Sequence, residues 1–168
     1  NVDLKHVEAY AQLAEIIVSR MDPVKFAARF NNGRDLEDDT IRDLVAKMGK
    51  WLFRGPLSNE EIATYRGVAS TVAHSGGDYK EAVGLILEAM LQSPRFLYRI
   101  ENQRGDGEPF PVGPYELASR ISYILWGGPP DESLLKAADS GEILSSDKAA
   151  EHVRRMLKDP RAKQRSLQ

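Results

Sequence analysis

The fold of this chain is decided by the stretch Tyr115-Glu116-Leu117-Ala118-Ser119-Arg120-Ile121-Ser122-Tyr123-Ile124-Leu125-Trp126. Glycine and proline bound it on both sides, and on a helix its aliphatic residues would share one face. Those residues are Leu117, Ala118, Ile121, Ile124 and Leu125. The two charged residues, Glu116 and Arg120, are four positions apart and are predicted to form an ion pair. We therefore predict a central helix that is surrounded by protein on nearly all sides.

Size and composition indicate a folded protein of one ordinary domain or two small ones. The chain has 168 residues, of which 42% are hydrophobic and 29% charged, which is not the composition of a disordered chain. The net charge of −2 gives no reason to expect nucleic acid or an anionic membrane as a partner. No cysteine is present, which excludes disulfides, thiolate zinc sites, a cysteine nucleophile and covalent c-type haem within these residues. No apolar run approaches the roughly 20 residues of a membrane-spanning helix.

The rest of the chain also follows helical spacing, so we predict an all-α fold: an irregular bundle of about seven or eight helices. Helices near residues 41–54, 59–74 and 79–92 are expected to pack as an antiparallel group. Capping signals precede several helices, among them Asp22-Pro23 and the capping box of Ser58 with Glu61. Asn31-Asn32-Gly33 is expected to end a short helix in the left-handed conformation. The first helix, about residues 2–20, is expected to pack through Val7, Tyr10, Leu13, Ala14, Ile17 and Val18.

A run of glycine, proline and charge over residues 101–113 is typical of an exposed loop and marks a boundary between two halves. We predict an N-terminal helical domain over residues 1–100. Residues 114–168 are expected to begin a second helical domain, truncated here and packed on the first through Phe96, Leu97 and Tyr98. Both ends of the chain lie inside helical patterns, so we expect a piece of a longer protein.

Four segments resemble, in order, two adjacent domains of unknown function from large exported planctomycete-type proteins. The segments are residues 51–61, residues 91–99, the central stretch 115–126 and residues 153–162. Together they extend the resemblance from about Ile41 to the end of the chain, whereas the first 40 residues match less clearly. Such proteins often carry cytochrome-c-like domains as well. The resemblance implies a periplasmic, cell-envelope or secreted parent protein with haem elsewhere, and the remainder of that polypeptide as the partner. It supplies no catalytic residue and no cofactor for this chain.

One group of charged residues is the candidate site: Arg95, Arg99, Glu116 and Arg120. Arg95 and Arg99 are one turn apart, and the four side chains could form a network between the halves. A clamp for an anion or a substrate carboxylate is one interpretation. A structural ion-pair lock is the other, and we favour it. Ser119 and Ser122 lie beside Arg120 without a histidine nearby in the sequence, so neither is marked as a nucleophile.

Other groups have simpler structural interpretations. His6, His74 and His152 lack metal-ligand spacing, and we expect solvated or capping roles. Asp35, Glu37 and Asp39 offer oxygen ligands for calcium, but the EF-hand spacing is absent and acids at a helix start explain them. Aromatic residues suit a sugar-stacking or haem-facing surface, although core packing is the default. They are Trp51, Phe53, Phe96, Tyr98, Tyr115, Tyr123 and Trp126.

The basic end of the chain lacks aromatic residues for base stacking, so a solvated face, or a contact with the remainder of the parent protein, is preferred over phosphate contacts. It comprises His152, Arg154, Arg155, Lys158, Arg161, Lys163 and Arg165. Nucleic-acid binding remains a third hypothesis. The first is a non-catalytic scaffold or interaction module of a larger exported redox protein. The second is part of an enzyme, acting on polysaccharide or as an oxidoreductase, whose active site is completed outside this chain. The sequence identifies neither substrate nor reaction.

Overall fold

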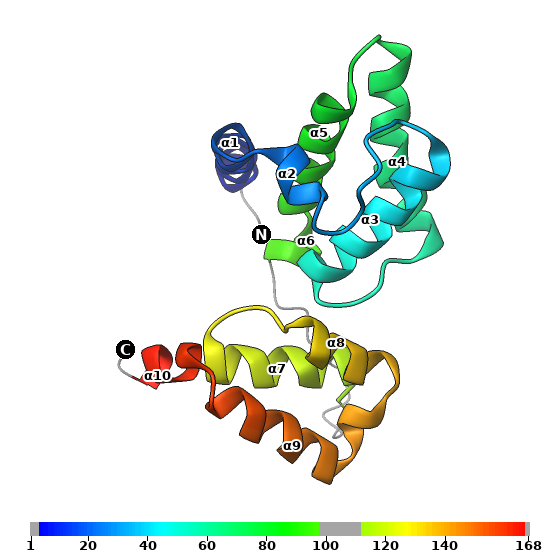
Figure 1. The fold of residues 1–168 in the computed structure, drawn as a ribbon. Helices are drawn as coiled ribbons and strands as arrows, with labels where there is room; N and C mark the ends of the chain where they lie inside the picture. The colour runs from blue at the N-terminus through cyan, green and yellow to red at the C-terminus, as the bar shows by residue number, and fades with distance from the viewer. Residues whose placement is uncertain (1–3, 98–111, 167–168) are drawn as a thin grey trace, which may run out of the picture. The chain divides into compact units, whose positions relative to one another are not determined.

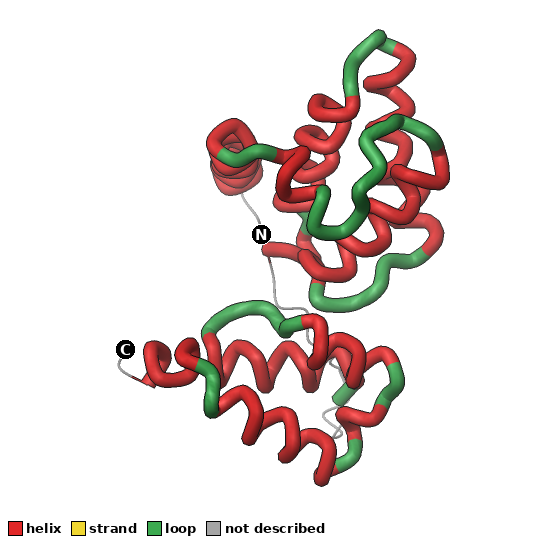
Figure 2. Tube along the Cα trace, viewed as in Figure 1, coloured by secondary structure: helices red, strands yellow, loops and turns green. Residues whose placement is uncertain are grey.

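The chain is helical throughout the part that the computed structural model describes, residues 4–97 and 112–166, with side chains for 8–97 and 112–164. This part holds ten α-helices, one 3₁₀ helix and no strand (Figures 1 and 2). The predicted all-α class is confirmed, but the predicted count of seven or eight is too low. The excess consists of short helices, such as Pro94–Leu97, which a cap and a proline start as separate elements. None of the described helices combines the length and apolar character needed to cross a membrane.

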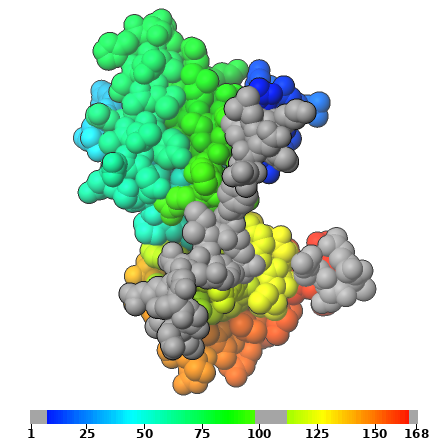
Figure 3. Space-filling model, turned by 180° about the vertical axis from the view of Figure 1, so that it is seen from behind, coloured from blue at the N-terminus to red at the C-terminus, as the bar shows by residue number. Residues whose placement is uncertain are grey.

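The chain divides into two compact units, Asn1–Arg99 and Ile100–Gln168. The first unit holds six of the described helices: α1 (Leu4–Arg20), α2 (Pro23–Ala27), α3 (Asp38–Phe53), α4 (Asn59–His74), α5 (Tyr79–Leu91) and α6 (Pro94–Leu97). Helix α4 packs against both α3 and α5, as expected for the predicted helical group. Helix α5 also contacts α1, α2 and α6, so it is the centre of this unit. Figure 3 shows the outer surfaces of α4 and α5 side by side in green.

The core of the first unit is built from aliphatic side chains of α3 and α5. Its largest fully buried members include Leu44, Met48, Ile86 and Met90. Burying one such side chain contributes roughly 1.5–3 kcal/mol, so these two helices supply much of the driving force for this unit. Gly49 is buried among them. A Cβ atom at this position would collide with the Leu57 side chain, so the close packing favours glycine there.

Local capping agrees with the sequence at three helix starts. Asp22 accepts a hydrogen bond from the Lys25 amide at the start of α2. Ser58 and Glu61 form both bonds of the predicted capping box at the start of α4. Asp78 caps α5 by accepting from the Glu81 amide at 2.9 Å. Side-chain acceptors thus satisfy helix-start N–H groups that have no partner within the helix.

The predicted left-handed ending at Asn31-Asn32-Gly33 is wrong. The Asn31 side chain instead accepts from the Gly33 amide and donates to Asp43, which turns the chain without a positive φ. Arg54, in contrast, is a non-glycine residue in the left-handed region, at φ 59°, where it ends α3. A non-glycine residue at such a φ is uncommon, which directs attention to what its side chain binds.

Helix α1 is less buried than its pattern predicts. Ala14 and Val18 face the core, whereas Leu13 and Ile17 are exposed. Tyr10 is half-buried, and the side chain of Val7 lies outside the described part. The six-residue apolar face was therefore overestimated, because α1 packs mainly on α5 and α5 covers only a narrow stripe.

The second unit holds α7 (Pro114–Trp126), α8 (Glu132–Asp139), η1 (Glu142–Leu144), α9 (Ser146–Leu157) and α10 (Pro160–Ser166). Helix α7 contacts each of the other four, which makes it the organising helix of this unit. Its core joins Ala118 and Trp126 of α7 to Leu134, Ile143 and Met156.

Helix α7 is covered along most of its surface. Ala118, Ser119, Ser122 and Trp126 are buried, but Ile124 is 70% exposed. Twelve of its 13 positions are thus buried or half-buried, so the predicted cover is largely present, but Ile124 lacks it. The predicted docking of this helix through residues 96–98 stays a prediction, and Tyr98 lies outside the described residues.

Candidate functional site

The first predicted site residue, Arg95, is bound within its own unit. Its Nη1 donates to both carboxylate oxygens of Glu61 at 2.8 Å, and its Nη2 donates to the Pro56 carbonyl at 3.2 Å. Helix α6 carries Arg95 to this position, and Glu61 extends from the first turn of α4. The guanidinium thus locks the start of α4 to the segment that follows α5.

Glu61 serves this contact and the cap at the same time. Its Oε2 also accepts from the Ser58 amide at 2.8 Å. Burial by itself would raise the pKa of the Glu61 carboxyl, but the hydrogen bonds from Arg95 and Ser58 outweigh it and hold that pKa below its ordinary value. The carboxyl is therefore an ionised structural anchor at neutral pH.

Aromatic and backbone contacts complete this cluster. The Arg95 guanidinium lies 5.1 Å from the centroid of the Phe53 ring, within cation–π range. Arg54, the residue in the left-handed conformation, donates from its Nη2 to the Arg95 carbonyl at 2.9 Å. Tyr65 hydrogen-bonds Ser93, and burial raises the pKa of its phenol. The end of α3, the start of α4 and α6 are thereby joined through side chains.

The remaining predicted site residues divide between the other unit and the undescribed part. Glu116 and Arg120 form the predicted i, i+4 ion pair on α7, which is confirmed. Arg99 lies outside the described residues. Arg95 and the Glu116–Arg120 pair belong to separate units, so a network among all four stays a prediction. Sequence reasoning missed Glu61 as the partner of Arg95, because its place in a capping box already explained it.

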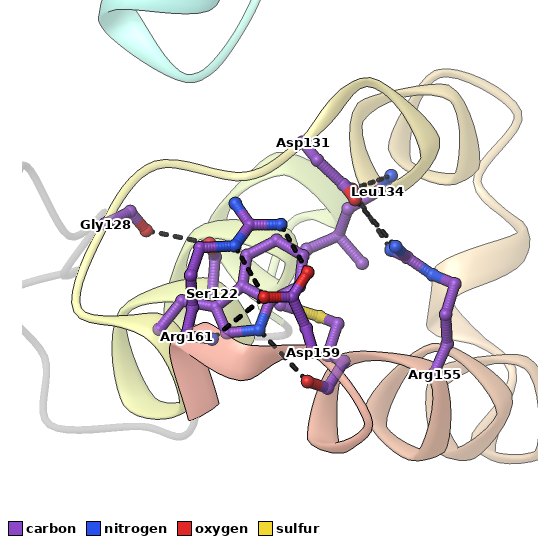
Figure 4. A network of polar contacts seen from close by, with 9 residues as sticks. Ser122, Gly128, Asp131, Leu134, Arg155, Asp159 and Arg161 are labelled. Atoms are coloured by element: carbon purple, nitrogen blue, oxygen red, sulfur yellow. Dashed lines mark hydrogen bonds and ion pairs between the residues drawn. The ribbon is translucent and has the colours of Figure 1, made fainter. Parts of the chain in front are cut away.

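A second cluster surrounds Trp126 in the C-terminal unit. Figure 4 shows Asp131, Arg155, Asp159 and Arg161 of this cluster. The indole Nε1 donates to the Met156 carbonyl at 3.1 Å, and the ring is only 9% exposed. The Arg161 guanidinium lies 3.5 Å from the ring centroid and the Arg155 guanidinium 5.8 Å. Two helices near the C-terminus therefore close over the last residue of α7.

Both arginines are also held by carboxylates. Arg155 makes two hydrogen bonds to Asp131, at 2.7 and 3.1 Å, while Asp131 caps α8 through the Leu134 amide. Burial opposes ionisation of Asp131, but the bonds from Arg155 and Leu134 lower its pKa below the ordinary value. Arg161 bonds both oxygens of Asp159, and together with the Arg161 amide it lowers the pKa of that carboxyl to about 2. Two of the seven residues of the basic end are thus paired.

Two hydroxyl groups near α7 have structural partners. Ser122 donates to the Gly128 carbonyl at 2.7 Å and so fixes the turn that follows α7. Tyr115 donates to Asp139, and burial together with that carboxylate raises the pKa of Tyr115 to about 12. Ser119 is buried on the same helix. These arrangements give no activated nucleophile.

The histidines and the acidic group form no metal centre in the described part, where no three His, Cys, Asp or Glu side chains gather around one point. His74 contacts the Ser70 carbonyl through Nδ1 at 2.6 Å, one turn back on the same helix. Nδ1 of His152 is buried without a hydrogen-bond partner among the described residues. Asp35 accepts from the Glu37 amide, as an acid near a helix start does. The side chain of His6 lies outside the described part.

Comparison with known families adds the last observation. Residues 40–101 match the family described as PSD5, a protein of unknown function (DUF1595), and residues 112–168 match PSD4, a protein of unknown function (DUF1592). No curated protein and no solved structure matches the chain. The first match contains the Glu61–Arg95 cluster and the second contains the Trp126 cluster. The chain therefore carries a DUF1595 domain and a DUF1592 domain in tandem, both of unknown function.

Proposed function

We propose that this chain is a non-catalytic scaffold or interaction module of a larger exported, haem-containing redox protein. The observation that carries this proposal is the closure of Arg95 on Glu61 and on the Pro56 carbonyl. A clamp for a substrate carboxylate needs guanidinium donors that point into free space. The donors of Arg95 are engaged inside the protein, which favours a structural lock.

The setting of the module comes from the resemblance of four segments to domains of exported planctomycete-type proteins. The tandem match to two domains of unknown function is in keeping with it. On this proposal the haem belongs to another part of the parent polypeptide, since this chain has no cysteine for its covalent attachment. The partner is the remainder of that polypeptide, in the periplasm, in the cell envelope or outside the cell.

An association measurement tests the proposal. The 168-residue chain and the remaining parent polypeptide are purified separately and mixed in a calorimeter, and we expect saturable 1:1 binding. A folded chain that shows no association would contradict an interaction role.

A second experiment tests the enzymatic alternative. Arg95→Met and Arg120→Met are introduced into the parent polypeptide, and turnover of polysaccharide and of redox dyes is followed. We expect any turnover to keep its kcat, apart from losses that track thermal stability. A drop in kcat with unchanged melting and unchanged association would replace the scaffold with an enzyme.

A further inference from the structure

A cleft of about 670 Å³ lies in the first unit, between the end of α1 and one stripe of α5. The stripe consists of Glu81, Gly84, Leu85 and Glu88, which recur at helical spacing. Gly84 faces α1, and a Cβ atom there would make an ordinary van der Waals contact with the Val18 side chain at 3.6 Å. The remaining lining residues are Val18, Ser19, Met21, Pro23, Gly76, Gly77, Asp78 and Lys80.

The cleft is lined by both apolar and charged residues. Val18 and Leu85 are among the apolar residues; Val18 is buried, whereas Leu85 is 41% exposed. The lining holds three carboxylates but one ammonium group, Lys80. An exposed large apolar side chain beside unbalanced charge indicates a surface that a complementary partner can cover.

Glu88 is the half-buried carboxylate of the lining, whereas Asp78 and Glu81 are exposed. No lysine or arginine of the described residues forms an ion pair with Glu88. Burial raises the pKa of Glu88, and the nearby carboxylate Glu15 raises it further. Asp78, by contrast, is engaged in capping α5. A cation brought to Glu88 would relieve both of these unfavourable effects.

We infer that this cleft is the docking site for a cationic amphipathic segment of the partner polypeptide. A lysine or arginine of the segment pairs with Glu88, and an apolar side chain one turn away packs on Leu85 and Val18. Leu85 and Glu88 are themselves one turn apart on α5, so a helical segment matches their spacing. The inference rests on the proposed function, because the segment belongs to the remainder of the parent polypeptide.

A binding measurement on the whole 168-residue chain tests this inference. The probe is a synthetic helical peptide with leucine and lysine one turn apart, and the control peptide has glutamate in place of each lysine. We expect fluorescence anisotropy to report saturable binding of the lysine peptide that weakens at high salt, and none of the control. No binding of the lysine peptide, or equal binding of both, overturns the inference.

Variants of the chain locate the contact. Glu88→Gln removes the charge with little change in volume, and we expect it to weaken lysine-peptide binding by about tenfold, as for a charge-assisted hydrogen bond. Leu85→Ala is expected to weaken it by a similar factor. Glu37→Gln makes the same charge change outside the cleft, without removing a cap hydrogen bond, and should leave binding unchanged. Equal affinity for wild type and Glu88→Gln overturns the inference.

Failure here differs from failure of the proposed function. If the parent polypeptide binds the chain and Glu88→Lys leaves that affinity unchanged, the module role stands and this docking site is wrong. If the parent polypeptide does not bind at all, the module role fails whatever the peptide does.

Discussion

Arg161 places its guanidinium 3.5 Å from the centroid of the Trp126 ring, across 35 residues of sequence. The same guanidinium bonds both oxygens of Asp159, so its position over the ring is fixed from two directions. Helix α10 is therefore part of the second unit, and it covers the end of the helix on which that unit is built.

Replacing Arg161 tests this contact. Arg161→Ala should lower the free energy of unfolding by about 1 kcal/mol, within the usual range for a partly exposed cation–π contact. Chemical denaturation followed by the fluorescence of Trp126 in a Trp51→Phe background measures it. Lys163→Ala, at an exposed position on the same helix, is the matched control and should change little. Equal effects of the two variants would show that the stacking does not stabilise the unit.

Removing the Trp126 side chain should be far more costly. Trp126→Ala leaves a cavity in the core and removes the indole hydrogen bond to the Met156 carbonyl, so we expect a loss of about 3–5 kcal/mol. Trp126→Phe keeps most of the ring and should lose less. Ile124→Ala, at a 70% exposed position on the same helix, should be nearly neutral in urea denaturation. A neutral Trp126→Ala variant would refute the central place of this residue.

The Glu61–Arg95 pair is suited to a double-mutant cycle. The two side chains are 34% and 31% exposed, so solvent screening reduces the coupling, and we expect about 1 kcal/mol between Glu61→Gln and Arg95→Met. The fully solvated pair Glu132–Lys136 is the control and should show little coupling. Equal coupling in both pairs would argue against a structural lock at Arg95.

Acid should destabilise the chain through its arginine-bound carboxylates. The folded-state pKa values of Glu61, Asp131 and Asp159 are all lowered, that of Asp159 to about 2. Below the ordinary values of 4.5 for Glu and 3.8 for Asp the unfolded state takes up protons first, so stability falls as the pH drops from there towards 2. Urea denaturation at stepped pH measures the slope, which should be shallower in Asp131→Asn. An identical slope in that variant would contradict the role of the Asp131–Arg155 pair.

Glu88 should act in the opposite direction. Its pKa is raised in the folded state, so the folded protein binds this proton more tightly, and stability is lost as the pH rises through the folded-state pKa. Glu88→Gln should therefore raise the melting temperature at neutral pH and have less effect in acid. Calorimetry at neutral and at acidic pH measures the melting temperatures of the variant and of wild type, with Glu37→Gln as a control. A variant that melts below wild type at neutral pH would mean that Glu88 already has a stabilising partner.

Local features of this fold were accessible from the sequence. Helix type, the caps at Asp22 and Ser58, and the Glu116–Arg120 pair depend on spacings of three or four residues, which the helix repeat fixes. The number of helices was harder to predict from the sequence, because a cap followed by proline, as at Pro94, starts a new helix without a long break.

Features that join distant segments were not accessible. Arg95 finds Glu61 across 34 residues, and Arg161 finds Trp126 across 35. Periodicity says which face of a helix is apolar but not which neighbour covers it, nor how much of it. The same limit explains Ile124, which belongs to an apolar pattern and yet is exposed.

The two hydrophobic cores have a genetic consequence. The buried cluster that contains Met48 and Ile86 draws only on the first unit, and the one that contains Trp126 and Met156 draws only on the second. Recombination between the two coding segments would leave each protein interior with all its own side chains. The two coding segments can therefore be duplicated separately or fused to other domains during evolution.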